Sequence, residues 1–362
     1  MTRPRSTAAR ASRGAVAALC LAAPLVAAGC TGGSSSSSSG GGGAAVVGTP
    51  GAAATSLQDA YEAVIRQDLP SVVQITADVG LGSGVVFDKT GDVVTNAHVV
   101  GSAKTFQVRF SNASGTYPAT LVGSYPPDDL AVIRVQHAPA LTPATFGDSS
   151  KVVVGAIVLA MGNPLGLSSS VTNGIVSAVG RTVAEPVSTD SPGATLPNVI
   201  QTSASINPGN SGGALVDLTG AVIGIPTLAA TDPQLGGGAA PGIGFAIPAN
   251  LVKDIAGQLV LNGRVTDSHR AALGLTVTTV TDTSGQPTGA GVVSVTPGGP
   301  AASAGLQPGD VITSIAGQQV TDATSLSAVL AGLQVGQAVP VTVERGDGQR
   351  TITVTLGQLP GS

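Results

Sequence analysis

Short apolar runs separated by Gly, Pro or Asn-Gly dominate the chain from about residue 70 to residue 250. Runs rich in Val and Ile that turn residues interrupt predict β-strands rather than helices. The predicted strands are Ser71–Ala77, Gly84–Phe87, Asp92–Thr95, Phe106–Phe110, Ala131–Gln136, Ala156–Met161, Val171–Val179, Ala214–Val216 and Val222–Ile225. Many short strands of this kind predict a β-sandwich or a β-barrel.

A helix precedes this region and a second β-rich region follows it. Apolar residues recur at helical spacing from Leu57 to Ile65, which predicts a helix that starts near Ser56 and stops at Pro70. After Asn262 the predicted elements are strands at Gly274–Val280 and Gly291–Val295, a helix at Ser325–Leu333, and a hairpin of Val339–Arg345 with Gln349–Leu356. The pattern therefore predicts two folded units, which also fits a length of 362 residues.

The N-terminus has the pattern of an export signal. Four Arg residues precede an apolar run, Gly14–Ala28, that is shorter than the ~20 residues a membrane-spanning helix needs. The run ends in small residues, Val26–Gly29, which lead into Cys30 and resemble the lipobox of bacterial lipoproteins, so cleavage there would leave Cys30 acylated. The alternative is a cleaved secretory signal in which Cys30 is incidental. Cys20 would leave with the signal in either case, so we expect no disulfide.

The segment after Cys30 is rich in Gly and Ser and predicts a flexible tether. The predicted organisation is a lipoprotein signal peptide at 1–29, a tether at 30–56, a first folded unit at 57–262, a linker at 263–270 and a second folded unit at 271–358. We therefore expect a bacterial, extracytoplasmic protein that a lipid anchors to the cell membrane.

Composition excludes several classes of protein. Apolar residues make up 42% of the chain and charged residues only 10%, with 51 Gly and 24 Pro, which argues against a charge-rich disordered protein and against a coiled coil. Aromatic residues are 2%, Trp is absent, and the formal charge is −4. Because nucleic-acid binding needs basic surface or stacking aromatics, we expect no nucleic-acid partner. We also expect no metal site and no cofactor.

The candidate chemistry starts from the three histidines of the chain. His98 lies at the end of an apolar strand, where a side chain can face a cleft, whereas His137 leaves a strand toward Ala-Pro and His269 lies in the predicted linker. Taken alone, a histidine in the position of His98 is more often structural than catalytic. Whether His98 is catalytic therefore depends on the other reactive residues of the chain.

A glycine-rich turn, Asn207–Gly213, surrounds Ser211. Glycine adopts positive φ and lets another backbone approach, so such a turn can expose the hydroxyl and direct backbone N–H groups at one point, as in an oxyanion hole. The candidate donors are the N–H groups of Gly209 and Ser211, with Asn210 as a secondary donor. The alternative for such a turn is a plain surface loop.

Two carboxylates, Asp128 and Asp129, precede the strand that starts at Leu130. The order His98, Asp, Ser211 is that of chymotrypsin-type proteases and differs from that of subtilisins and α/β-hydrolases. Serine is a weak nucleophile, so an imidazole must accept its proton, and a buried carboxylate must orient that imidazole. The sequence therefore predicts a two-barrel serine protease.

At these residues the chain closely resembles the HtrA/Deg family of serine proteases. The matching stretches are Gly82–Phe87, Thr95–Val100, Asp129–Val132, Gly162–Gly166, Asn207–Leu215 and Gly242–Pro248. The resemblance implies a mainly β protein, with a chymotrypsin-like double β-barrel followed by one PDZ domain. It selects Asp129 over Asp128, because the family's catalytic Asp directly precedes Leu-Ala-Val.

The resemblance also implies further site residues. It implies a small apolar specificity pocket, so that the enzyme would cleave after Val, Ala or Ile. This pocket would be formed by Ile206, Ile243, Gly244, Phe245 and Ile247. The long Gly-rich segment Thr227–Pro241 corresponds to an activation loop. In the second unit, the carboxylate-binding loop and first strand of the PDZ domain would supply Arg270, Leu273, Gly274, Leu275 and Thr276.

The function that the resemblance implies is a serine endopeptidase that degrades misfolded or damaged exported proteins. Its partners would be unfolded proteins and the C-terminal peptides that a PDZ domain binds. Members of the family usually form trimers, so the resemblance also implies a homo-trimer. The alternative from another class is a PDZ-bearing chaperone or scaffold whose protease domain is silent. The presence of His98, Asp129 and Ser211 together argues against that alternative.

Overall fold

The computed structural model describes residues 50–77, 80–138, 140–163, 170–185, 194–207, 209–232, 238–346 and 348–361. The predicted signal peptide, Cys30 and the tether up to residue 49 lie outside these residues. The chain divides into Met1–Gly48 and Thr49–Ser362, and every element below belongs to the second part. Within the described residues, no helix combines the length and the apolar character needed to cross a bilayer.

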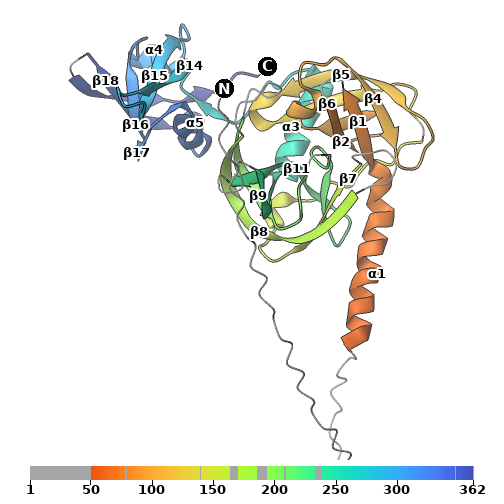
Figure 1. The fold of residues 1–362 in the computed structure, drawn as a ribbon. Coiled ribbons are helices and arrows are strands. Elements are labelled where there is room, and N and C mark those ends of the chain that lie inside the picture. The colour runs from red at the N-terminus through yellow and green to blue at the C-terminus, as the bar shows by residue number, and fades with distance from the viewer. Residues whose placement is uncertain are drawn as a thin grey trace, which may run out of the picture. The chain divides into compact units, whose positions relative to one another are not determined.

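The first strands close into an antiparallel barrel (Figure 1). They are β1 (Val72–Ala77), β2 (Gly80–Val86), β3 (Asp92–Thr95), β4 (Thr105–Phe110), β5 (Tyr117–Tyr125) and β6 (Leu130–Val135). Their order around this first barrel is β1-β2-β3-β6-β5-β4. Inward side chains such as Ile75, Val108 and Ile133 are fully buried, as alternation along a strand requires.

The next strands close into a second barrel. They are β7 (Ile157–Gly162), β8 (Ser170–Glu185), β9 (Ala194–Thr202), β10 (Ala214–Asp217), β11 (Val222–Asp232) and β12 (Gly238–Pro248), in the order β10-β11-β12-β9-β8-β7. One apolar cluster contains Val85 and Val94 of the first barrel together with Leu159 and Val216 of the second. The expected chymotrypsin-like double barrel is confirmed, and its largest apolar cluster joins the barrels.

Helices precede, connect and follow the barrel strands. They are α1 (Pro50–Asp68), η1 (Leu69–Ser71), α2 (Ala97–Val100), η2 (Pro126–Asp128), η3 (Ser149–Lys151) and α3 (Ala249–Asn262). Helix α3 buries Val252, Ile255 and Leu259 against the cluster that joins the barrels.

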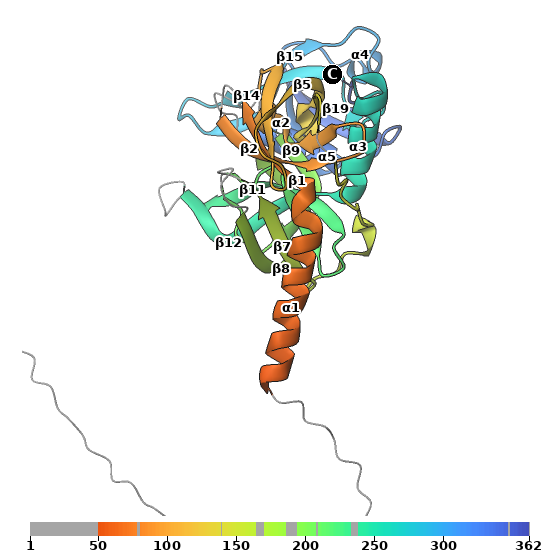
Figure 2. The ribbon, with the colours of Figure 1, turned by 90° about the vertical axis from the view of Figure 1, so that its right-hand side faces the viewer.

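Helix α1 leads into β1 (Figure 2) and begins at Pro50, earlier than the expected start near Ser56. The end of the predicted tether is therefore helical. Alanine has the highest helix propensity, and proline is tolerated in the first turn of a helix, so the segment from Pro50 through Ala52–Ala54 favours this extension.

The C-terminal unit has its own core and its own main sheet. Its elements are β13 (Ala271–Ala272), β14 (Leu275–Thr281), β15 (Pro287–Val295), α4 (Pro300–Ala304), β16 (Val311–Ile315), β17 (Gln318–Gln319), α5 (Ala323–Ala331), β18 (Ala338–Arg345), β19 (Gly348–Thr355) and β20 (Gly357–Gln358). The sheet order is β14-β15-β16-β18-β19, so β14 lies at an edge. Leu306, Ile312, Leu326 and Val341 are buried in this core.

Strands β5, β9, β12 and β16 were not among the predicted ones. Pro118, Pro197 and Pro241 lie in the first three, and Pro and Gly normally signal turns rather than strands. The expected activation loop Thr227–Pro241 is largely strand, because β11 continues to Asp232 and β12 starts at Gly238, while residues 233–237 lie outside the described part. Register shifts in the β11–β12 ladder let strands with so many breakers remain paired.

The predicted linker, 263–270, is held to the protein at both ends. Val265 is buried in the cluster that joins the barrels, and the side-chain oxygen of Gln258 on α3 accepts hydrogen bonds from the N–H groups of Thr266 and Asp267. The hydroxyl of Ser268 donates to the carbonyl of Leu359 at 2.8 Å. A short polar stretch without apolar periodicity looks flexible in sequence, yet this one is fixed by its neighbours.

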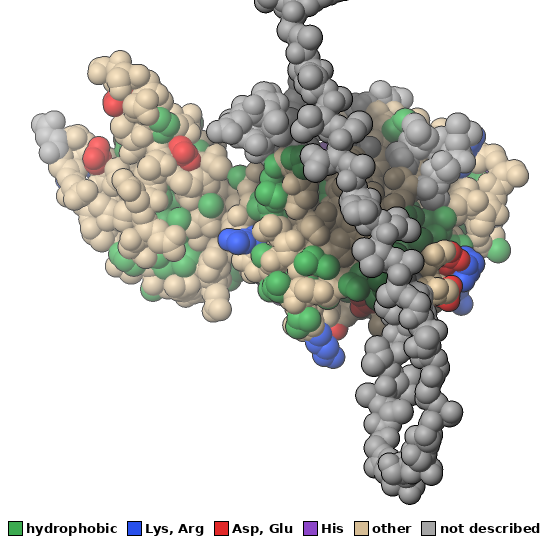
Figure 3. Space-filling view, turned by 60° about the horizontal axis from the view of Figure 1, so that its bottom comes forward, with side chains coloured by type: hydrophobic (Ala, Val, Ile, Leu, Met, Phe, Trp, Pro, Cys, Tyr) green, Lys and Arg blue, Asp and Glu red, His purple; other side chains and the backbone are tan. Residues whose placement is uncertain are grey.

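The surface reflects the low content of charged residues. On the face shown in Figure 3, uncharged polar and hydrophobic side chains prevail, and Lys, Arg, Asp and Glu are few. Among the described residues, several large apolar side chains are exposed, including Leu81, Val153, Val154 and Leu261. Contacts of such a surface with other molecules depend more on shape and apolar area than on charge.

Candidate active site

The expected histidine and aspartate meet in the first barrel. Nδ1 of His98 lies 2.9 Å from Oδ2 of Asp129 and 3.1 Å from Oδ1. The backbone N–H of His98 also donates to Oδ1 at 2.9 Å. The Asp129 side chain is 1% exposed and that of His98 is 24% exposed, so a buried carboxylate orients an imidazole that is open to solvent on one side.

The local fold aims Asp129 at His98. Residues Pro126–Asp128 form the 3₁₀ turn η2, and the N–H of Asp129 donates to the carbonyl of Pro126. Asp129 then adopts the left-handed region, with φ 50°, which aspartate tolerates better than most residues. The side-chain amide of Asn96, which precedes α2, donates to the carbonyl of Asp129 at 3.0 Å.

Thr227 of β11 connects this pair to the second barrel, and the sequence reasoning missed it. Its hydroxyl donates to Oδ2 of Asp129 at 2.5 Å, a length typical of a hydrogen bond to a charged oxygen. Its carbonyl accepts the hydroxyl proton of Ser211 at 3.0 Å. The available signal was a polar residue two positions after the apolar run Val222–Ile225, but threonine is common in strands and carries no catalytic pattern.

Ser211 lies in a turn that the first barrel holds in place. The N–H of Ser83 on β2 donates to the carbonyl of Ser211 at 3.0 Å, and the Ser83 hydroxyl donates to the carbonyl of Gly209. The N–H of Asn163 donates to the same hydroxyl oxygen at 2.8 Å. Gly209 has φ 109°, as the glycine-rich turn required, whereas Pro208 lies outside the described residues. Both barrels therefore position the serine.

The candidate oxyanion donors differ from one another in the structure. The N–H of Asn210 already donates to the carbonyl of Asn207 at 3.1 Å, and its side chain bonds Asn207 and Ser205. Asn210 is thus a structural residue of the turn, which corrects its expected role as a secondary donor. The N–H of Ser211 has no acceptor among the described residues. It remains a candidate donor together with Gly209.

Four of the expected specificity-pocket residues lie on β12 and alternate between its two faces, whereas Ile206 lies in the loop after β9. A Cβ at Gly244 would lie 2.3 Å from Cγ1 of Ile206, so these two pack face to face. Phe245 and Ile247 instead join the cluster between the barrels, and Ile243 is 38% exposed. Because neighbouring strand residues point to opposite sides, these five residues cannot all line one pocket. Only Ile206 and Gly244 keep the expected arrangement.

The loop of the second unit that we expect to bind a carboxylate is held by its own carbonyl groups. The carbonyl of Leu273 accepts the N–H of Ala301 at 2.8 Å, and that of Gly274 accepts the N–H of Thr296 at 2.9 Å. The Leu273 side chain is buried in the core, and Gly274 has φ 70°. Leu275 and Thr276 open the edge strand β14. An open edge beside this loop can accept an added peptide strand.

Arg270 departs from the expectation that it binds a peptide carboxylate. Its guanidinium donates to Oδ1 of Asp128 at 2.9 Å and to the carbonyls of Pro127 and Thr195. These acceptors lie on η2 and β9, so the guanidinium is engaged by the protease unit. Burial raises the pKa of the Asp128 carboxyl to about 6, and the neighbouring charge of Arg270 opposes that rise.

Comparison with known proteins matches both units. The family model of a trypsin-like peptidase domain matches residues 82–225, and that of a PDZ domain matches residues 271–356. The serine protease PepD of Mycobacterium tuberculosis is 39% identical over 329 residues, which cover 84% of this chain and 68% of PepD. The chain belongs to the HtrA family of serine proteases.

Other HtrA relatives give the same result. The periplasmic serine endoprotease DegP of Escherichia coli is 39% identical over 287 residues, or 77% of this chain and 57% of DegP. The HtrA-type protease AlgW, solved with a decapeptide, is 31% identical with a TM-score of 0.55, covering 83% of this chain and 99% of its own. A serine endoprotease from Yersinia pestis is 34% identical with a TM-score of 0.55, covering 83% and 98%. This HtrA protein is a serine-type endopeptidase.

Proposed function

We propose that this HtrA protease cleaves peptide bonds with Ser211 as nucleophile, His98 as general base and then general acid, and Asp129 as the residue that orients His98. The observation that carries the proposal is the hydrogen-bonded connection from His98 through Asp129 and Thr227 to Ser211. A buried carboxylate paired with Nδ1 leaves Nε2 of the imidazole as the nitrogen that accepts a proton.

The reaction follows from these contacts. The Ser211 hydroxyl leaves the Thr227 carbonyl, gives its proton to Nε2 of His98, and its oxygen attacks the scissile carbonyl carbon. The N–H groups of Ser211 and Gly209 receive the oxyanion. The His98 proton passes to the leaving amine as the C–N bond breaks. Water then hydrolyses the acyl-enzyme by the same steps, while Asp129 stays ionised and stabilises the imidazolium.

The proposed substrates are unfolded segments of exported proteins. The contact of Ile206 with Gly244 supports a shallow pocket for a small apolar side chain, such as Val, Ala or Ile. The edge strand β14 and the loop at Gly274 support recognition of a hydrophobic C-terminus by strand addition. Unfolded chains expose both features, whereas folded proteins bury their apolar side chains and pair their strands.

We place the protein outside the cytoplasm of a bacterium. DegP is named as periplasmic, and the N-terminal segment of this chain has the pattern of an export signal. Lipidation of Cys30 would anchor the protein to the membrane. Metabolic labelling with palmitate tests the anchor: wild type should carry label and Cys30→Ser should not, whereas an unlabelled secreted product would contradict it.

The family resemblance also leads us to propose a homo-trimer. Exposed apolar side chains such as Leu81, Val153 and Val154 are compatible with contacts between copies. Sedimentation equilibrium of the purified protein should give three times the chain mass, and a monomer at every concentration would contradict the trimer.

Proteolysis of casein by the purified protein tests the proposed function. Wild type should release peptides whose new ends follow Val, Ala or Ile, read by N-terminal proteomics, and Ser211→Ala should release none. A hydrophobic C-terminal peptide added to the reaction should change the rate or the pattern. Equal proteolysis by wild type and Ser211→Ala would contradict the function and favour a silent PDZ-bearing scaffold.

A further inference from the structure

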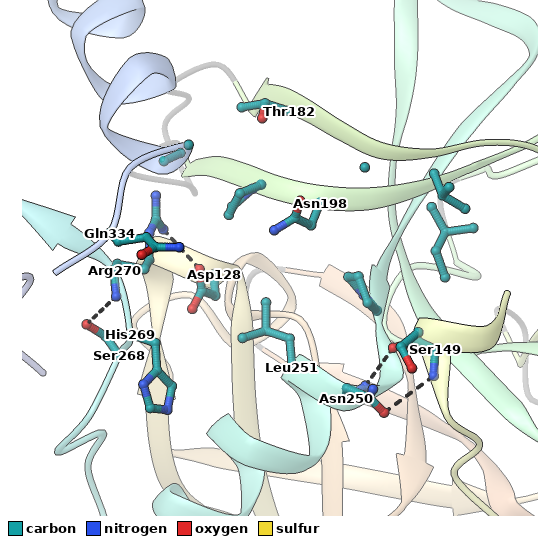
Figure 4. A pocket seen from close by; sticks show the side chains of 18 of the residues that line it. Asp128, Ser149, Thr182, Asn198, Asn250, Leu251, Ser268, His269, Arg270 and Gln334 are labelled. Atoms are coloured by element: carbon teal, nitrogen blue, oxygen red, sulfur yellow. Dashed lines mark hydrogen bonds and ion pairs between the residues drawn. The ribbon is translucent and has the colours of Figure 1, made fainter. Parts of the chain in front are cut away.

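A single guanidinium, that of Arg270, joins the turn before the catalytic aspartate to the second barrel. It donates to Oδ1 of Asp128 at 2.9 Å and to the carbonyl of Pro127 on η2, and to the carbonyl of Thr195 on β9 at 2.8 Å. Figure 4 shows the side chains of Arg270 and Asp128 joined in this way. The Arg270 side chain is 14% exposed and that of Asp128 is 1% exposed, so these contacts are shielded from water.

The acceptors of Arg270 lie next to the catalytic pair. Residues Pro126–Asp128 form η2, and Asp129 caps its C-terminal end, in the left-handed region with φ 50°. An aspartate in that region depends on its surroundings to hold the backbone there. The Arg270 contacts fix the carbonyl of Pro127 and the carboxylate of Asp128, and therefore the direction from which Asp129 reaches His98.

Asp128 depends on Arg270 for its charge balance. Its other oxygen, Oδ2, is buried and has no hydrogen-bond partner within the part of the chain that the structure describes. Arg270 in turn is the last residue of the linker, directly before the PDZ unit, and its carbonyl accepts the N–H of Leu359 at 2.7 Å. The next residues, Ala271–Ala272, pair with β20. The guanidinium that reaches η2 is thus carried by a backbone that the C-terminal strand of the PDZ unit holds.

Space is available beside these contacts. A cavity of about 720 Å³ borders Asp128, Asn198, His269 and Arg270 (Figure 4). Movement of Arg270 into this cavity would release η2 without displacing apolar core side chains. Arg270 can therefore leave these contacts without any change in the packing of the apolar core.

We propose that Arg270 is a positioning residue for the catalytic reaction, which holds Asp129 against His98 through the η2 turn and β9. The inference rests on the proposed role of Asp129. Lysine cannot replace Arg270, because one ammonium group lacks the planar fork that reaches acceptors on two segments at once.

Kinetics of Arg270→Gln and Arg270→Lys with a short chromogenic peptide test the proposal. We expect kcat to fall about 10- to 100-fold in both variants, the effect of a catalytic group displaced by a fraction of an ångström to 1 Å, with KM unchanged. The acid limb of the kcat/KM profile should move to lower pH, because a less well paired imidazole binds its proton less tightly. The matched control is Arg264→Gln, an exposed arginine of the same linker, which should behave as wild type.

Loss of Arg270 alone leaves the buried Asp128 charge unpaired, which can unfold the protein. The double variant Arg270→Met with Asp128→Asn removes both charges and keeps the side-chain volumes, so its melting temperature should stay near that of wild type. The same loss of kcat and the same pH shift are expected in this folded variant.

The outcomes separate the inference from the proposed function. A folded double variant with the kcat and pH profile of wild type would overturn the positioning role alone, provided that wild type is labelled at Ser211 by a fluorophosphonate. A wild-type enzyme that is not labelled there would overturn the proposed function and, with it, this inference.

Discussion

The two barrels position the proposed catalytic groups by different physical means. In the first barrel, hydrogen bonds between polar groups orient the side chains of His98 and Asp129. The turn that carries Ser211 is hydrogen-bonded as well, but it also depends on backbones that approach too closely for any side chain. A Cβ at Gly212 would lie 2.3 Å from the carbonyl oxygen of Ser83, and one at Gly213 would lie 2.1 Å from that of Met161.

This difference determines which substitutions harm each half. In the first barrel, isosteric substitutions that remove a charge or a hydrogen-bond donor should lower kcat and leave the packing of the barrel intact. In the second barrel, addition of one methyl group at a glycine beside Ser211 should lower kcat although no reactive group changes. The predictions below test this contrast in order of expected effect.

Asp129→Asn should produce the largest loss in the first barrel. The amide keeps the size of the carboxylate but favours the wrong imidazole tautomer, so kcat should fall about 10⁴-fold, as in other chymotrypsin-type proteases. Peptide hydrolysis measures kcat, and thermal unfolding should show a folded protein. Asp59→Asn, at an exposed carboxyl of α1, is the matched control and should not change the rate. A loss below 10-fold in a folded Asp129→Asn protein would contradict the assignment.

Gly213→Ala should produce the largest loss in the second barrel. The added Cβ meets the backbone oxygen of Met161, which cannot move away, so the turn that carries Ser211 must shift. We expect kcat to fall about 100-fold and stability to fall by about 1–3 kcal/mol. Denaturant unfolding and peptide hydrolysis measure the two effects.

Gly257→Ala is the control for Gly213→Ala. A Cβ at Gly257 meets nothing within 4 Å, and the residue lies inside α3, so alanine should stabilise the protein by about 0.5–1 kcal/mol. Similar behaviour of the two variants would show that glycine has no special role at Gly213.

Thr227 joins the two halves and should show an intermediate effect. Thr227→Val keeps the shape but removes the hydrogen bond to Asp129, and a hydrogen bond to a charged group contributes ~1.5–3 kcal/mol, so kcat should fall about 10-fold or more. Thr227→Ser keeps the donor and should retain most of the rate. Equal rates for the Val and Ser variants would remove Thr227 from the catalytic connection.

Sequence alone predicted the parts of this site that depend on residue identity. The glycines around Ser211, the order of His98, Asp129 and Ser211, and the apolar strands of both barrels each have a local pattern. The role of Thr227 and the engagement of Arg270 depend instead on contacts between segments far apart in the chain. Strands β9 and β12 were missed because their Pro and Gly residues oppose strand formation locally, and pairing within a closed barrel overrides that preference.

Asp68 should show the smallest effect, on stability rather than on rate. The residue is 4% exposed at the end of α1, and burial raises its pKa from 3.8 to about 6 against a weaker opposing hydrogen bond from Gln67. A carboxyl with a raised folded-state pKa contributes stability below the unfolded pKa and loses it as the pH rises through 6.

Asp68→Asn should therefore stabilise the protein by about 1–3 kcal/mol at pH 7.5 and change little at pH 4. Denaturant unfolding at both pH values measures the difference. An equal effect at the two pH values would show that Asp68 does not titrate in this way.

Mass-spectrometric mapping of a fluorophosphonate adduct tests the central claim most directly, namely that His98 and Asp129 from one barrel activate Ser211 from the other. The account predicts one adduct, on Ser211, whose rate of formation falls about 10²- to 10⁴-fold in His98→Ala. An adduct on another serine, or equal rates with and without His98, would contradict it.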